Sequence, residues 1–149
     1  LLEGAMLTSV VGLSAGAGLC HAMAYPVGNR YHTHHGATIA TLTPASTIEY
    51  NAATDPERFA RVADLFGVDT SGVSDREAAG RLKEAYVRLQ RDLDVLPSGL
   101  AELAGVTEDD VDWLAERTVE TQDRLLRCNP RPVTEEAVRE VYLDALYNW

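Results

Sequence analysis

The sequence predicts an all-α fold that forms one domain over residues 1–149, and three observations support this prediction. From residue 55 onward, apolar side chains recur at the three- and four-residue spacing of a helix that buries one face. The longer of these segments begin with Ser, Thr or Asp, which are typical helix N-cap residues. No segment shows the apolar and polar alternation of a half-buried strand.

The first third of the chain is predicted to contain two buried helices joined by a turn. Residues 4–29 carry no formal charge, and the small apolar residues of 6–24 are typical of a central helix that is packed on every side. Pro26 and Gly28 are predicted to end this helix and to let the chain double back. A second uncharged helix is expected over 36–50, with a kink or break at Pro44, because proline argues even more strongly against a central strand.

The remaining two thirds of the chain are predicted to form amphipathic helices with defined ends. Asp55 and the proline after it form an N-cap with proline at the first helical position, and Ser74 begins a capping box. A short helix is expected over 100–104, and a rigid loop over 129–132, where two prolines exclude helix. The predicted helix starts therefore follow Asp55, Ser74, Gly99, Thr107 and Thr134, the last helix is expected to run to Trp149, and the total is six or seven helices.

Composition and charge exclude several classes of partner. The net charge is −10, from 23 acidic against 13 basic residues, and the basic residues form no cluster that could bind phosphates. Cys20 and Cys128 are isolated from each other and form no CxxC motif, so a cytoplasmic location is expected. The abundance of Gly, Ala and Ser near the N-terminus, without a basic flank, argues against a membrane span or signal peptide. We therefore expect an acidic protein that binds neither nucleic acid nor membrane.

All four histidines of the chain lie within residues 21–35. His21 is expected near the C-terminus of the first helix, where the helix dipole favours a cation, and His35 at the N-terminus of the next helix. His35 would then bind a metal only through a neutral imidazole. Two imidazoles are too few for a catalytic metal site, and His32 and His34 are candidates for the remaining ligands. The alternative is that these histidines merely pack in the core or cap helices.

Two motifs connect these histidines to a known family. Residues 18–28 read GLCHAMAYPVG, and residues 31–36 read YHTHHG. Together they resemble the metal-binding signature of the iron-containing (group III) alcohol dehydrogenases, which belong with the dehydroquinate synthase-like proteins. In that signature one His precedes an apolar turn that ends in proline, and a second His follows fourteen residues later in a His-Gly pair. His21 and His35 have this separation, and the resemblance continues through residues 49–51, 58–67, 94–97 and 129–132 to the last helix.

The resemblance implies a specific role for this chain. It implies the C-terminal helical domain of an alcohol dehydrogenase, in which His21 and His35 are two of four ligands to Fe2+ or Zn2+. An Asp and a further His are expected on a helix upstream of residue 1. The NAD(P) site is expected in an N-terminal nucleotide-binding domain, on the same or a separate polypeptide. We also expect a small alcohol or hydroxy-acid substrate and a homo-oligomer, and we expect the isolated chain to be inactive.

Two positions depart from the family pattern. Tyr25 stands where many members have a further histidine that lines the cleft, so Tyr25 is expected near the substrate as a hydrogen-bond donor. His34 replaces the usual proline before the second ligand. The Leu-Cys-His sequence at 19–21, the Tyr-Pro pair at 25–26 and the Asp-Leu-Asp stretch at 92–94 also resemble the hydroxyacid-oxoacid transhydrogenase branch, which is the first alternative. A non-catalytic helical interaction domain or inactive fragment is the second.

Overall fold

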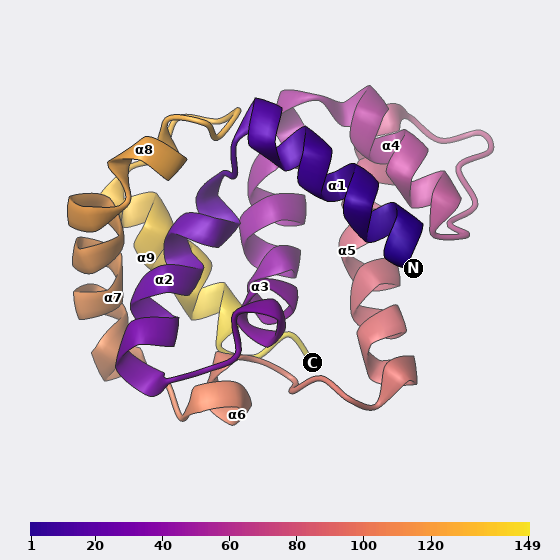
Figure 1. Cartoon of the computed structure of the whole chain (residues 1–149). Coiled ribbons are helices and arrows are strands. Elements are labelled where there is room, and N and C mark those ends of the chain that lie inside the picture. The colour runs from indigo at the N-terminus through magenta and orange to yellow at the C-terminus, as the bar shows by residue number, and fades with distance from the viewer.

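The computed structural model describes all 149 residues, and it contains helices and loops but no strand, which confirms the all-α prediction. It has nine α-helices rather than the predicted six or seven, because the first predicted helix is divided and a short helix near residue 125 gave no clear sequence signal. The helices are α1 (Leu2–Ala15), α2 (Leu19–Tyr31), α3 (His35–Thr43), α4 (Pro56–Leu65), α5 (Asp75–Leu93), α6 (Leu100–Ala104), α7 (Glu108–Thr121), α8 (Asp123–Leu126) and α9 (Glu135–Ala145), with a π-helical segment η1 (Pro44–Glu49) and a 3-10 turn η2 (Ala52–Thr54) (Figure 1).

The predicted helix starts are confirmed by their hydrogen bonds. The side chains of Asp55, Ser74 and Thr134 each accept a bond from the backbone N–H three residues later, at 3.2 or 3.3 Å. At the start of α7, the Asp110 carboxylate accepts bonds from both the backbone N–H and the hydroxyl of Thr107, at 3.0 and 2.9 Å. These local contacts satisfy helix N–H groups that have no partner within the helix.

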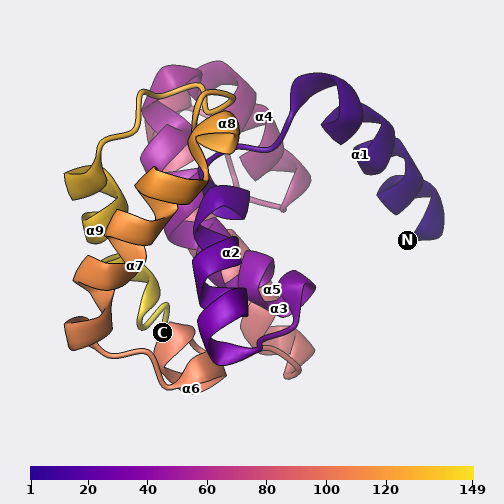
Figure 2. The same cartoon turned by 60° about the vertical axis from the view of Figure 1, so that its left-hand side comes forward.

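The prediction of one buried helix over residues 6–24 is wrong. The chain breaks between α1 and α2, which meet at 101°, and α1 has no buried residue. Figure 2 shows α1 projecting from the other helices. The break lies at Gly16, whose φ of 77° is readily adopted only by glycine, and a Cβ there would lie 2.6 Å from the Cys128 Sγ. No single helix is long and apolar enough to cross a bilayer, although α1 and α2 taken together pass that test by length and composition.

Pro26 does not end a helix, which corrects a second prediction. It lies inside α2, and the helix continues to Tyr31. The reversal occurs instead at His32, which has a left-handed φ of 55° and donates its N–H to the Gly28 carbonyl at 2.9 Å. A proline inside a helix costs about 3 kcal/mol, and here the burial of Met23, Pro26 and Val27 in the core offsets that cost.

Pro44 is accommodated by a change of helix type rather than by a break. The helix predicted over 36–50 is present as α3, which continues directly into η1 at Pro44. A π-helical turn inserts one residue into the hydrogen-bond ladder, which makes room for a residue without an N–H. The two segments together therefore form one long rod, and His35 is the first helical residue at one end of it.

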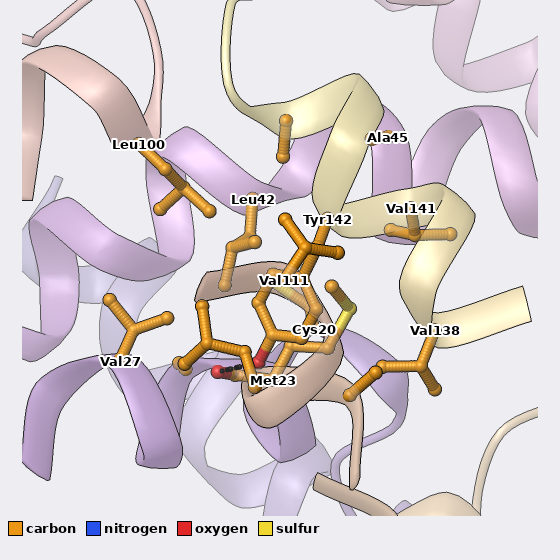
Figure 3. Packing of buried hydrophobic residues seen from close by; sticks show 14 of the residues in the cluster. Cys20, Met23, Val27, Leu42, Ala45, Leu100, Val111, Val138, Val141 and Tyr142 are labelled. Carbon is orange, nitrogen blue, oxygen red and sulfur yellow. Dashed lines mark hydrogen bonds between the residues drawn. The ribbon is translucent and has the colours of Figure 1, made fainter. Parts of the chain in front are cut away.

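The main core lies between α2, the α3–η1 rod, α7 and α9. Figure 3 shows the side chain of Tyr142 of α9 at its centre, pointing toward Met23. The fully buried Tyr142 hydroxyl donates to the Met23 carbonyl at 2.7 Å and lies 2.9 Å from the Thr118 hydroxyl. A smaller core of Ile48, Ala63 and Leu82 holds the α4–α5 hairpin against η1. The main core fixes α2 beside α3, with the Cys20 Sγ of α2 3.5 Å from the Ile39 carbonyl oxygen of α3.

The last helix ends at Ala145 and does not run to Trp149 as predicted. Asn148 holds the terminal segment against other loops: its backbone N–H donates to the Ser98 carbonyl at 2.7 Å, and its side chain donates to the Thr41 carbonyl at 3.0 Å. These long-range bonds take the place of the helical bonds that the terminal residues would otherwise make.

Candidate metal centre

The structure brings His21 and His35 together. His21 is the third residue of α2, and His35 is the first residue of α3. Their ring centres lie 5.3 Å apart, with an angle of 56° between the ring planes. Tyr25 follows His21 by one helical turn, and its ring centre lies 5.7 Å from that of His35. The three side chains that the sequence singled out therefore form one cluster.

The spacing of the two imidazoles fits a shared metal ion. Two imidazoles that bind one tetrahedral metal through nitrogens at about 2.1 Å place their ring centres about 5 Å apart. The observed 5.3 Å agrees with this value. The ring-centre distance of His21 and His35 is thus compatible with one shared ion.

The cluster contains only two metal-binding side chains. No group of three or more His, Cys, Asp or Glu side chains lies within reach of one ion anywhere in the structure. His32 is exposed and forms the C-cap of α2, and His34 is exposed and forms the N-cap of α3. The His34 carbonyl accepts bonds from the backbone N–H and the hydroxyl of Thr38, both at 3.0 Å. His32 and His34 therefore shape the turn and do not complete the site.

Both histidines lie at helix N-termini, which corrects the expected position of His21. A helix N-terminus carries partial positive charge, so it disfavours a protonated imidazole. Burial lowers the pKa of His21, and the nearby His35 lowers that pKa further. His21 is therefore neutral at pH 7, and a neutral imidazole has the free nitrogen lone pair that a metal requires.

The cluster lies on an open face of the domain. His21 is half-buried, His35 is exposed, and Tyr25 is 44% exposed although its neighbours in α2 are buried. A large aromatic side chain left exposed beside two imidazoles indicates a surface that a substrate or another protein segment can cover.

The loop over residues 129–132 holds the first turn of α2 in place. The Asn129 side-chain oxygen accepts a bond from the Leu19 N–H at 3.2 Å, two residues before His21. Asn129 and Asn51 also exchange a pair of side-chain bonds at 2.9 and 3.2 Å. Gly18 allows this approach, because a Cβ there would lie 2.7 Å from the Asn129 oxygen. Asn129 therefore caps α2 from a distant part of the chain.

Arg131 and Pro132 of the same loop both contact Tyr50. The Arg131 guanidinium lies 4.2 Å from the centre of the Tyr50 ring and donates to the Tyr50 carbonyl at 3.1 Å. The Tyr50 hydroxyl donates to the Pro132 carbonyl at 2.6 Å. Sequence reasoning marked this loop as rigid and as part of the family resemblance, but it gave no indication that the loop caps the helix carrying His21. The two prolines were the available signal in the sequence. They indicate that the backbone of the loop is stiff, but not which residues the loop contacts.

Substitution of Asn129 by alanine is expected to lower the free energy of unfolding by about 2 kcal/mol, because it leaves the Leu19 N–H and the Asn51 side-chain oxygen without partners. It should also loosen the turn that carries His21 and weaken metal binding about tenfold. Urea unfolding and chelator competition measure the two effects. Asn29→Ala, at an exposed position with no side-chain hydrogen bond, is the control and should change stability by less than about 0.5 kcal/mol.

The fold and the cluster define a helical domain that presents two imidazoles and a tyrosine on an open face. The sequence of residues 1–146 matches the family described as Fe-containing alcohol dehydrogenase family, C-terminal. The chain belongs to this family, as its resemblance in sequence predicted.

Three relatives illustrate the relationship. The chain is 36% identical to lactaldehyde reductase of Escherichia coli (strain K12) over 132 residues, which are 89% of this chain and 33% of that protein. It is 35% identical to 1,3-propanediol dehydrogenase of Citrobacter freundii, with the same coverage of both chains. The structure of an alcohol dehydrogenase from Oenococcus oeni superposes with a TM-score of 0.78 at 34% identity, and the match covers 87% of this chain and 33% of that one. The chain thus spans about a third of the length of these relatives.

Proposed function

We propose that this chain forms the metal-binding side of an alcohol dehydrogenase active site, with His21 and His35 as two ligands of one divalent metal ion, Fe2+ or Zn2+. The remaining ligands and the NAD(P) site belong, in this proposal, to a nucleotide-binding domain on the same or a separate polypeptide. The substrate is a small alcohol, which the complete protein oxidises to an aldehyde or ketone.

The observation that carries this proposal is the paired imidazoles. They come from two different helices, their ring centres are 5.3 Å apart, and no third metal-binding side chain accompanies them. A buried structural site would be closed by its own chain, whereas a catalytic site keeps positions free for other ligands and substrate. If the active site lies between two domains, each domain must present part of the ligand set on an exposed face, as this domain presents His21 and His35.

The residues of this chain have distinct roles in such a site. His21 and His35 bind the metal as neutral imidazoles, which the lowered pKa of His21 supports. Tyr25, beside His35, donates its hydroxyl to the substrate oxygen or to a water next to it. The bound metal supplies Lewis-acid chemistry, which lowers the pKa of an alcohol so that hydride transfer becomes easier. Asn129 and Asn51 keep the first turn of α2 in position.

Reconstitution of the two halves of the site tests the proposal. The purified 149-residue chain is expected to bind Zn2+ or Fe2+ weakly and to oxidise no alcohol with NAD or NADP. Addition of the nucleotide-binding part should give one tightly bound metal ion per complex, measured by elemental analysis, together with NAD(P)-dependent oxidation. Alcohol oxidation by the isolated chain would contradict the proposal. A complex without metal would instead support a helical interaction domain.

A further inference from the structure

A cavity that His21 lines adjoins a second, apolar cavity. The first, called the site cavity here, has a volume of about 350 Å³ and is lined by His21 and Cys20 of α2, by Ile39 of α3 and by Asn129. The second, called the apolar chamber, has a volume of about 320 Å³ and lies between η1, α4 and α5. Thr43, Thr47 and Phe59 line both cavities, so the two adjoin each other along these residues.

The path between the cavities follows the α3–η1 rod. Ile39, Thr43 and Thr47 lie on successive turns of this rod. The Cys20 Sγ lies 3.5 Å from the Ile39 carbonyl oxygen and 3.8 Å from the Thr43 hydroxyl, so the first turn of α2 adjoins the beginning of the path. Eight residues at a rise of 1.5 Å give about 12 Å from Ile39 to Thr47, which is the length of an extended chain of roughly ten carbons.

The walls of the chamber are apolar. Ile48, Val62, Phe66 and Leu82 line it, together with the ring of Tyr86. The Thr43 hydroxyl at the neck already donates to the Ile39 carbonyl at 2.7 Å. The chamber therefore offers hydrocarbon contacts but few free hydrogen-bonding groups.

Only one charged residue lines the chamber. The side chain of Arg58 is 81% exposed, and its guanidinium lies 3.4 Å from the Asp55 carboxylate, so it points toward solvent and already has a partner. A carboxylate placed in the chamber would lose its hydration without gaining a buried partner. A hydroxy acid is therefore a poor occupant, and an aliphatic chain is a good one.

We propose that the apolar chamber binds the hydrocarbon tail of the substrate, so that the preferred substrates are unbranched primary alcohols of about six to ten carbons. The hydroxyl lies at the His21 end of the site cavity, and the tail passes Thr43, Thr47 and Phe59 into the chamber. This inference rests on the proposed function and adds a substrate class to it.

The test measures kcat/KM for ethanol, 1-butanol, 1-hexanol and 1-octanol with the native holoprotein, meaning the chain with the nucleotide-binding part and its metal. Each added methylene that enters the chamber is expected to raise kcat/KM about threefold to fourfold. Val62→Phe fills the chamber and should lower the ratio of kcat/KM for 1-octanol to kcat/KM for ethanol at least tenfold. Leu65→Phe is the matched control: it adds the same ring to α4 at a position that is 83% exposed and does not line the chamber.

A binding measurement separates this inference from the proposed function. Addition of 1-octanol to the metal-free protein should shift the NMR signals of the Val62 and Leu82 methyl groups, and Val62→Phe should abolish the shift at Leu82. If these shifts appear but no alcohol is oxidised, the chamber is supported and the proposed function fails. If short alcohols are oxidised with no dependence on chain length, or if Val62→Phe leaves the dependence unchanged, the chamber proposal is overturned. Preferential oxidation of hydroxy acids would also overturn it and would favour the transhydrogenase alternative.

Discussion

Replacement of either His21 or His35 by alanine is expected to reduce bound metal in the native holoprotein from about one ion per chain to a trace. Each variant removes one of the two imidazoles that we propose as metal ligands. Loss of the metal removes several kcal/mol of transition-state stabilisation, so kcat/KM for an alcohol should fall about a thousandfold. Elemental analysis and steady-state kinetics measure the two effects.

His32→Ala and His34→Ala are the matched controls for this experiment. They remove imidazoles from the same turn, but both side chains are exposed and belong to helix ends rather than to the cluster. Both should retain full metal content. Equal metal content in all four variants would show that the histidines of the cluster only pack together. Because the pKa of His21 is lowered, protons should compete with the metal for this residue only below the usual titration range of histidine, which a titration of bound metal against pH measures.

Gly99→Ala is expected to lower the free energy of unfolding by about 3 kcal/mol and the melting temperature by roughly 10 °C. Gly99 is extended, with φ of −179°, so its backbone is accessible to any residue and the effect is purely steric. A Cβ at this position would overlap the Leu146 carbonyl and lie 2.8 Å from the Tyr147 Cα. The two segments are also joined by the bond from the Ala101 N–H to the Leu146 carbonyl at 3.2 Å, so neither can move away freely.

Gly80→Ala is the control, and it is expected to raise the free energy of unfolding rather than lower it. Gly80 lies inside α5, and a Cβ there would have no atom within 4 Å. Alanine should stabilise the helix by about 0.5 to 1 kcal/mol because it reduces the conformational freedom of the unfolded chain. Thermal and urea unfolding of both variants would measure the difference. A Gly99→Ala variant as stable as the native chain would show that the C-terminal segment does not pack against residues 98–101.

Much of the metal site could be anticipated from the sequence, but not its geometry. The resemblance singled out His21, His35 and Tyr25, and the structure places all three in one cluster. His21 was expected near a helix C-terminus, because Pro26 was interpreted as the end of that helix. In the structure the helix continues through Pro26, and His21 lies in its first turn. Sequence reasoning gave the cost of proline in a helix, but it could not include the core contacts that offset this cost.

The sequence by itself determined the helical class and the ends of most helices. Caps such as Asp55 and Thr134 act on amides three residues away, so a short stretch of sequence contains both partners. Tertiary structure decided the rest, which includes the exposed position of α1, the passage of α2 through Pro26 and the capping of α2 by Asn129. Leu19 and Asn129 are 110 residues apart, and only the packing of the whole domain brings them together. The same packing brings the ring centres of His21 and His35, from two different helices, within 5.3 Å of each other, and this is the arrangement that the proposed metal site requires.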